Sequence, residues 1–289
     1  GDLAPQDQDR AFQASELRKV VVATNVAETS VTIDGIRHVV DSGVARVARY
    51  DGDRGIQTLF IEDISRASAD QRAGRAGRTA PGTCWRLWTE SGHLNRPAKN
   101  TPEIQRADLA EVVLLLHSLG IPKAAAFDWL DKPDLAAVER AEKLLHTLGA
   151  IDLRTERLTD VGARMLRLPM HPRFSRMLVE ASRRGCVPGA AQCAALVSGR
   201  DLLMRPGRDD TYMKEARELF EASDLSDFYT LMRAQQFAKK SGFSVETCRR
   251  YGIHAQTARQ IEDTFQQVMQ VADRERLIRD DDETVATDD

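Results

Sequence analysis

The 289-residue sequence has few cysteines, few aromatic residues and no long apolar run. Its four cysteines show no C-x-x-C spacing, which argues against a zinc site or a disulfide framework and favours free thiols in a cytoplasmic protein. No apolar stretch approaches the roughly 18 residues that span a bilayer, so no membrane partner is expected. The first residues also lack the basic and apolar regions of a signal peptide.

The sequence also lacks a strong charge of one sign, because its formal net charge is only −3. No global basic field therefore indicates a nucleic-acid partner, although a local basic patch can suffice. The 42% hydrophobic and 29% charged composition is that of a globular protein, and the length predicts two or three domains.

Residues 1–97 alternate β-rich apolar runs with glycine-rich turns, a pattern typical of an open α/β sheet. Short strands are predicted at 19–24, 37–41 and 83–88, and the first two are expected to be buried parallel strands. Residues 44–61 place a Gly/Asp turn between two strand-like runs, which predicts a β-hairpin.

Residues 98–168 predict a winged-helix domain, because two helices, a short hairpin and a third helix follow in that order. Apolar residues recur at helical spacing over 109–119 and again over 138–148. A short hairpin is predicted over 151–159, and either Thr159 or Asp160 is a candidate cap for the next helix. Such a fold does not by itself establish nucleic-acid binding.

Residues 169–273 predict a helical bundle, and the acid-rich residues 274–289 are expected to form a tail or linker. The candidate helices cover 173–184, 188–198, 211–222, 224–240, 244–250 and 255–272. The predicted fold class is therefore α/β plus all-α: a partial parallel sheet with a β-hairpin, then a winged helix and a bundle.

The stretch from Gln71 to Arg78, QRAGRAGR, carries the strongest chemical signal. In a continuous helix, with about 100° per residue, Arg75 and Arg78 lie within about 40° of Gln71. The shared face suits polyphosphate, because the planar guanidinium binds oxygens as a fork. Gly74 and Gly77 each cost a helix about 1 kcal/mol, which a merely structural helix has little reason to bear. Gly77 can instead end the helix, and a solvated basic helix is the structural alternative.

The segment 23–35, ATNVAETSVTIDG, directly follows a predicted strand, where ligands of open α/β sheets bind. Thr24, Asn25 and Thr29 carry short polar side chains that suit the phosphate oxygens of a nucleic-acid backbone. Asp34 is a candidate acceptor for a ribose hydroxyl. A polar loop whose side chains satisfy its own turns explains the segment equally well on chemistry alone.

Together, segments 23–36 and 71–78 resemble motifs V and VI of superfamily 2 RNA helicases in their DEAH-box (DEAH/RHA) version. The hairpin between the motifs, the winged helix and the helical bundle ("ratchet") extend this resemblance over nearly the whole chain. The amino-acid sequence at 68–71 and 81–84 is most similar to that of bacterial family members of the HrpB/HrpA type. The resemblance implies that residues 1–97 are the C-terminal part of a second RecA-like lobe.

The resemblance implies a nucleotide site formed with ATP and Mg²⁺. Gln71, Arg75 and Arg78 would face the ATP phosphates across a cleft between two lobes, as catalytic and nucleotide-binding residues. Asp34 would hold the ribose. No metal ligand is assigned within the chain.

The resemblance also implies a nucleic-acid site, with single-stranded RNA as the expected partner and DNA as an alternative. Thr24, Asn25 and Thr29 would lie near the nucleic-acid backbone or couple it to the nucleotide. Asp41 and Gly43, in the D-x-G that follows the predicted strand, would be structural.

Two departures from the family pattern shape the expected activity. The sequence contains neither G-x-x-x-x-G-K-[ST] nor Asp-Glu-Ala-His, so the phosphates and Mg²⁺ would be held mainly by a missing first RecA-like lobe. That lobe is the expected protein partner. The chain is therefore interpreted as a fragment of an ATP-dependent RNA helicase, a nucleoside-triphosphate hydrolase, and is expected to be inactive alone. The alternative is a non-catalytic nucleic-acid or protein-binding module.

Overall fold

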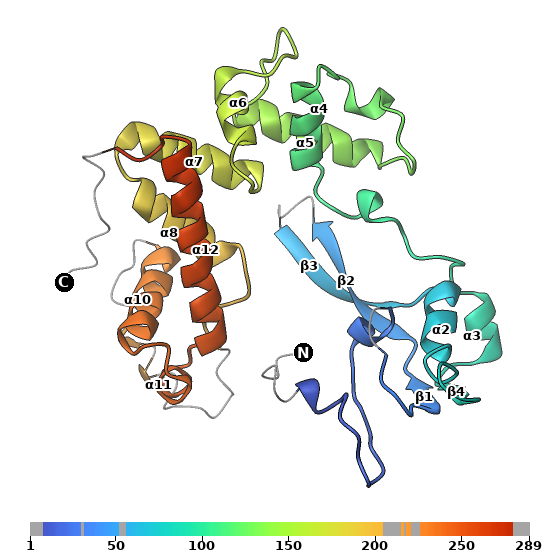
Figure 1. Ribbon diagram of the computed structural model, residues 1–289. Coiled ribbons are helices and arrows are strands. Elements are labelled where there is room, and N and C mark those ends of the chain that lie inside the picture. The colour runs from blue at the N-terminus through green and yellow to red at the C-terminus, as the bar shows by residue number, and fades with distance from the viewer. Residues whose placement is uncertain are drawn as a thin grey trace. The chain divides into compact units, whose positions relative to one another are not determined.

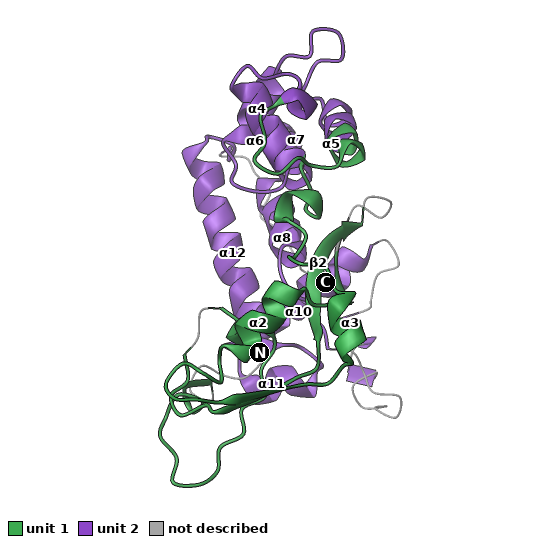
Figure 2. Cartoon of the chain, turned by 90° about the vertical axis from the view of Figure 1, so that its right-hand side faces the viewer, with its two compact units in different colours: residues 1–109, 127–140 green, residues 110–126, 141–289 purple. Residues whose placement is uncertain are grey.

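The computed structural model describes residues 8–29, 32–51, 56–204, 215–216, 218–220 and 226–279. The chain divides into two compact units, and it passes between them more than once (Figure 2). Unit 1 comprises residues 1–109 and 127–140, and unit 2 comprises residues 110–126 and 141–289.

Unit 1 contains a parallel pair of strands, β1 (His38–Asp41) and β4 (Thr83–Arg86). Their register runs from His38 opposite Thr83 to Asp41 opposite Arg86. Between them in sequence lies helix α2 (Arg66–Ala73), which packs on β1 (Figure 1). The strands predicted at 37–41 and 83–88 are thus confirmed, although β4 is shorter than expected. The expected burial of 37–41 is wrong, because Asp41 is the one buried residue of β1 and Val40 is 66% exposed.

The strand predicted at residues 19–24 is wrong. The segment is extended but belongs to no strand, and Val20 and Val22 are 82% and 95% exposed. Its β-branched residues favour extended backbone, but a buried strand also needs neighbours on its edges and faces. Within the described part of the chain, no strand pairs with this segment.

The predicted hairpin is confirmed as β2 (Val44–Asp51) and β3 (Ile56–Asp63), a long antiparallel pair (Figure 1). The turn at 52–55 lies outside the described residues. Arg49 on β2 bonds Glu62 on β3, with 2.8 Å between Nη2 and Oε2, and this bond lowers the pKa of Glu62. Unit 1 also contains the short turns and helices η1 (Asn25–Ala27), α3 (Glu90–Leu94) and η2 (Glu103–Gln105).

The winged-helix elements appear in the predicted order. The helices are α4 (Ala110–Ser118), α5 (Leu135–Thr147) and α6 (Asp160–Leu166), with the short η3 (Ala124–Ala126) after α4. Helix α5 begins in unit 1 and ends in unit 2. An antiparallel bridge between Ile151 and Leu158 forms the wing, and the Thr159 hydroxyl accepts a 3.0 Å bond from Gly162 N–H. The predicted cap is therefore confirmed.

The described remainder of unit 2 is mainly helical, as predicted, apart from an antiparallel bridge between Leu203 and Ile253. The helices are α7 (Pro172–Arg184), α8 (Val187–Val197), α10 (Asp227–Lys240), α11 (Val245–Arg250) and α12 (Ala255–Arg274). Helix α12 packs mainly on α8, and buried alanines on α8, α10 and α12 let the helices approach closely. The helix predicted over 211–222 and the tail from Asp280 fall largely outside the described residues.

Candidate functional site

Helix α2 presents one buried and one exposed face. Ser65 caps its N-terminus by accepting a 3.1 Å bond from Ser68 N–H. Ser68 and Ala69 are buried, whereas Gln71 is exposed. The helix therefore turns Gln71 toward solvent and the Ser68 side toward β1.

The helix ends at Ala73, so the prediction of a continuous helix through Arg78 is wrong, and so is a helix end at Gly77. The chain continues in tighter three-residue turns, such as the 3.0 Å bond from Arg75 N–H to Arg72 O. Glycine is costly inside a helix, which explains why the helix stops where Gly74 begins the Gly-rich sequence. Arg75 and Arg78 consequently do not share a helical face with Gln71.

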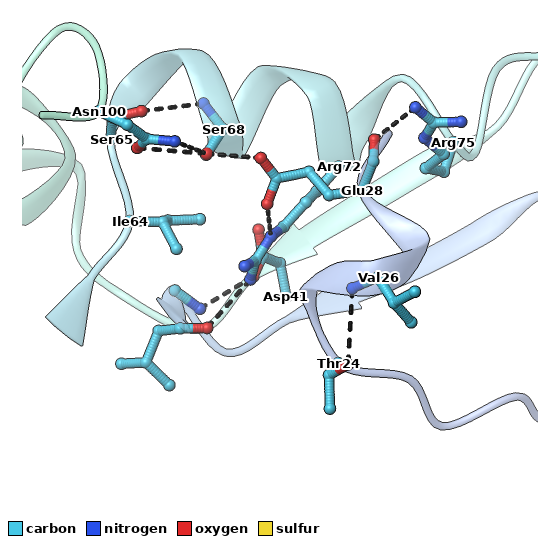
Figure 3. A network of polar contacts seen from close by, with 12 residues as sticks. Thr24, Val26, Glu28, Asp41, Ile64, Ser65, Ser68, Arg72, Arg75 and Asn100 are labelled. Carbon is cyan, nitrogen blue, oxygen red and sulfur yellow. Dashed lines mark hydrogen bonds and ion pairs between the residues drawn. The ribbon is translucent and has the colours of Figure 1, made fainter. Parts of the chain in front are cut away.

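Arg72 forms the centre of a buried ionic network (Figure 3). Its Nε donates to Glu28 Oε2 at 2.9 Å, and its Nη1 donates to Asp41 Oδ1 at 2.9 Å. The same Nη1 reaches Val44 O at 3.2 Å. The Arg72 side chain is only 14% exposed, and both carboxylates are buried. One guanidinium therefore joins helix α2 to the end of β1 and to the loop at 24–29.

The carboxylate of Glu28 is held at both oxygens. Ser68 Oγ donates to Glu28 Oε1 at 2.6 Å, while Arg72 bonds Oε2. Asn100 Nδ2 in turn donates to Ser68 Oγ at 3.1 Å. Glu28 thus binds two residues that lie one helical turn apart on α2, which fixes the loop against the helix (Figure 3).

A buried arginine, Arg96, also supports the end of β1. Arg96 Nη1 donates to Gly43 O at 2.8 Å and to Ile64 O at 2.9 Å, and its guanidinium lies 4.4 Å from the Trp88 ring centroid. Gly43 has φ +75°, and an added Cβ would lie 2.6 Å from both Arg96 Nη2 and Trp88 Cε3. Gly43 N–H donates to Asp41 Oδ1 at 2.9 Å. These contacts support the structural role expected for Asp41 and Gly43.

The two arginines expected to face phosphates both contact the segment 24–35. Arg75 Nη2 donates to the carbonyl oxygens of Glu28 and Thr29, the latter at 2.8 Å. Arg78 Nη1 donates to Thr32 Oγ1. Segments more than 40 residues apart in sequence are therefore brought together, as the two motifs require.

The other predicted site residues lie at the surface of unit 1. Thr24 accepts a 3.5 Å bond from Val26 N–H and so caps η1, in which Asn25 is the first residue. Thr24, Asn25 and Thr29 are exposed, as is Asp34. Asp34 precedes Gly35, whose φ of +79° marks a tight turn. Their polar groups are accessible to a ligand.

The sequence interpretation missed the residues that hold these groups in place. Ser68, Arg72 and Glu28 received no role, because charged and polar residues are usually solvent-exposed. A signal was available on α2: Ser68 and Arg72 are four residues apart, on the side that also carries Ala69. Ala69 is buried, so this side faces the interior.

Among the described residues, no group of three or more His, Cys, Asp or Glu side chains could hold a metal ion. A search of the same residues for membrane spans found no helix with the length and hydropathy needed to cross a bilayer.

Family comparisons match three successive regions of the chain. Residues 1–80 match the Helicase conserved C-terminal domain. Residues 141–170 match the winged-helix part of the Helicase associated domain (HA2), and residues 171–241 match its ratchet-like part. These regions follow the order of the sheet, the winged helix and the bundle.

Individual relatives agree with the family matches. The chain is 38% identical over 278 residues to the ATP-dependent RNA helicase HrpA of Escherichia coli, covering 93% of this chain and 21% of the relative. It is 36% identical over 277 residues to the pre-mRNA-splicing factor ATP-dependent RNA helicase prp22 of Schizosaccharomyces pombe, covering 95% and 24%. The crystal structure of the E. coli DExH-box NTPase HrpB matches with a TM-score of 0.64 and 38% identity, over 71% of this chain and 26% of that one.

Sheet, hairpin, winged helix and ratchet-like bundle define the chain as the C-terminal portion of a helicase. More particularly, it belongs to the DEAH-box family. The chain spans about a quarter or less of the length of these relatives.

Proposed function

We propose that this chain supplies one half of an ATP site, together with a nucleic-acid surface, in an ATP-dependent RNA helicase. The observation that carries the proposal is the contact of Arg75 with the carbonyls of Glu28 and Thr29. It joins the residues expected to face phosphates to the loop expected to contact nucleic acid. The names of the relatives, ATP-dependent RNA helicases, support the same activity.

The residues present fit the nucleotide part of this proposal. Arg75 and Arg78 offer guanidinium forks, which remain charged and bind phosphate oxygens in pairs. Gln71 adds an exposed amide, and exposed Asp34 can accept a bond from a ribose hydroxyl. When bound, ATP with Mg²⁺ supplies the phosphoanhydride bond whose hydrolysis transfers the terminal phosphoryl group to water, releases ADP and provides free energy. In this proposal a first RecA-like lobe holds most of the phosphate and metal contacts, and Arg75 and Arg78 neutralise charge on the transferred group.

The nucleic-acid part rests on Thr24, Asn25 and Thr29, which are exposed on one short segment. Hydroxyl and amide groups of this size bind phosphate and sugar, which position a strand without reading its sequence. We therefore propose single-stranded RNA as the partner, with single-stranded DNA as a possible second substrate. Closing and opening of the lobes during hydrolysis would move the strand.

The proposal assigns residues 1–97 to the second RecA-like lobe, 98–168 to the winged helix, 169–273 to the bundle and 274–289 to a tail or linker. The chain by itself is proposed to be inactive, with a first RecA-like lobe as its partner. All four cysteines are free thiols, which supports a cytoplasmic location as part of the proposal.

The test is RNA-stimulated ATP hydrolysis by this chain alone and by a protein in which a first lobe precedes it. We expect no activity from the chain alone. In the longer protein, Arg75→Ala should lower kcat by about 1,000-fold, because arginines that contact a transferred phosphoryl group contribute on this scale. Arg183→Ala is the matched control, since Arg183 lies exposed on α7 of unit 2.

Two outcomes would contradict the proposal. Hydrolysis by the chain alone would show that its own residues complete a nucleotide site. Full activity of the Arg75→Ala protein would show that Arg75 does not face the phosphates. Retained RNA binding without any effect of Arg75 would favour the alternative, a non-catalytic nucleic-acid-binding module.

A further inference from the structure

Arg72 differs from the other two arginines of its segment in its partners. Arg75 and Arg78 reach the segment 28–32 from the turn after α2, and Arg78 is exposed. The Arg72 side chain is 14% exposed and bonds two buried carboxylates. A residue enclosed in this way cannot reach a nucleotide or a nucleic acid without breaking the network.

The position of Arg75 depends on this network through Glu28. The carboxylate of Glu28 is fixed by Arg72 and Ser68, and the carbonyl of the same residue accepts a bond from Arg75. Glu28 therefore connects the buried ion pair to the guanidinium that is expected to face phosphate. The adjoining carbonyl of Thr29, which also binds Arg75, is placed by the same residue.

The chemistry of the network requires an arginine. Arg72 uses Nε for Glu28 and Nη1 for Asp41, and these two donors point in different directions within one rigid plane. A lysine ammonium keeps the charge but is a single point on a flexible stem. It can neutralise one of the two carboxylates well, but it cannot hold both in the observed geometry.

We propose that Arg72 is a positioning residue for the reaction. Together with Glu28 it places Arg75 and the loop 24–29, and it contacts neither ATP nor RNA itself. This inference rests on the proposed function, since positioning matters only if Arg75 faces phosphate. Displacement of a catalytic group by about 1 Å can cost about 100-fold in rate, so a network that only orients Arg75 can still control kcat.

Two substitutions weaken the network to different degrees. Arg72→Lys keeps the positive charge and removes the fork. Ser68→Ala removes the second bond to Glu28 without changing any charge, so it is expected to fold even if the lysine variant does not. Arg86→Lys is the matched control, because Arg86 pairs with the exposed Asp70 of the same helix at 2.7 Å, outside the buried network.

The first measurement is hydrogen exchange of the 289-residue chain. We expect amides at 24–29 to exchange about tenfold faster in Arg72→Lys, and less so in Ser68→Ala, because local opening becomes easier when fewer buried contacts hold a segment. The amides of α12 and those of the Arg86→Lys chain should be unchanged. Unchanged exchange at 24–29 in both network variants would overturn the inference.

The second measurement is ATP hydrolysis by the longer protein that carries a first lobe. Arg72→Lys should lower kcat by about 10- to 100-fold and leave KM for ATP nearly unchanged, because the binding contacts are retained. Glu28→Gln should have little further effect in the Arg72→Lys background, since both changes break one connection. A purely structural role predicts independent, multiplicative losses of kcat, and that result would overturn the inference. If Arg75→Ala is also without effect, the proposed function fails, whereas an effect of Arg75→Ala alone rejects only the role of Arg72.

Discussion

The arginines around α2 of unit 1 and those on α7 of unit 2 form ion pairs of opposite kinds. In unit 1, the Arg72 side chain is 14% exposed and Arg96 is buried, and both bond carboxylates or carbonyls from distant parts of the chain. In unit 2, Arg183 and Arg184 of α7 are 67% and 65% exposed. Both bind Glu180 of the same helix. The bonds are similar in length, but those of Arg72 and Arg96 connect separate elements, whereas those of Arg183 and Arg184 stay within α7.

This difference shows that the surroundings of an ion pair decide its role more than its geometry does. An exposed pair competes with water and salt, so it contributes little. A buried pair costs solvation energy, but removing one partner leaves an uncompensated buried charge. The pairs of Arg72 with Glu28 and Asp41 therefore specify how their segments meet, whereas the surface pairs of α7 add to a helix that already forms.

The largest expected effect is that of Arg72→Met on the stability of unit 1. The substitution leaves Glu28 and Asp41 buried without their cation, so the free energy of unfolding should fall by about 3–5 kcal/mol. All three tryptophans lie in unit 1, so urea unfolding followed by tryptophan fluorescence reports on it.

Arg183→Met on α7 is the counterpart in unit 2, and it should change stability by less than about 0.5 kcal/mol, as for a surface substitution. Equal losses of unfolding free energy in Arg72→Met and Arg183→Met would contradict the comparison. A small loss of unfolding free energy in Arg72→Met would mean that water reaches the carboxylates of Glu28 and Asp41.

The sequence predicted most elements whose stability is local. The helices of unit 2 follow from apolar spacing, from caps such as Thr159, and from Gly185, which ends α7 with φ +68°. The hairpin β2–β3 follows from two runs around a polar turn. In each case the residues that decide the structure lie close together in the sequence.

Features that depend on distant partners were not predictable in the same way. Residues 19–24 read as a buried strand, but burial requires neighbours that a local pattern cannot supply. The burial of Arg72 depends on Glu28 and Asp41, which precede it by 44 and 31 residues. The residue types of the candidate site could thus be predicted from the sequence, whereas the network of contacts that holds them could not.

Glycine substitutions give the next largest effect and compare backbone packing in the two units. A Cβ added at Gly82 in unit 1 would lie 2.1 Å from Ala76 O, and one at Gly162 in unit 2 would lie 2.2 Å from Ala150 O. Since backbone atoms cannot move aside easily, Gly82→Ala and Gly162→Ala should each cost about 1–3 kcal/mol. Urea unfolding, by fluorescence for unit 1 and far-ultraviolet circular dichroism for unit 2, measures both.

Gly77 and Gly199 are the controls, because a Cβ at either position meets no atom within 4 Å. Gly77→Ala and Gly199→Ala should be nearly neutral. The packing argument is wrong if the controls lose as much stability as Gly82→Ala and Gly162→Ala.

The smallest effect is expected at Glu180, and it depends on pH. Hydrogen bonds from Arg183, then Arg184, lower the pKa of Glu180 from 4.5 to about 2. A carboxylate with a lowered pKa stabilises the fold above its unfolded pKa, here 4.5, and this contribution is lost as pH falls toward about 2. Glu180→Gln should therefore lower the melting temperature slightly near neutral pH.

The difference between the native chain and Glu180→Gln should shrink as the pH is lowered below 4.5. Thermal unfolding followed by circular dichroism over this range measures it. Glu246→Gln, at an exposed carboxylate of α11, serves as the comparison variant. A difference that grows on acidification would contradict the sign of the pKa shift.

The extended segment at 19–24 has a consequence for any solution of the isolated chain. It presents open backbone and two exposed valines, and within the described residues no strand covers it. Such edges template pairing with other chains, and β-branched side chains give the new contact a dry face. Concentration is therefore an experimental variable for this protein: exchange and unfolding data are comparable only between samples whose sedimentation shows the same state of assembly.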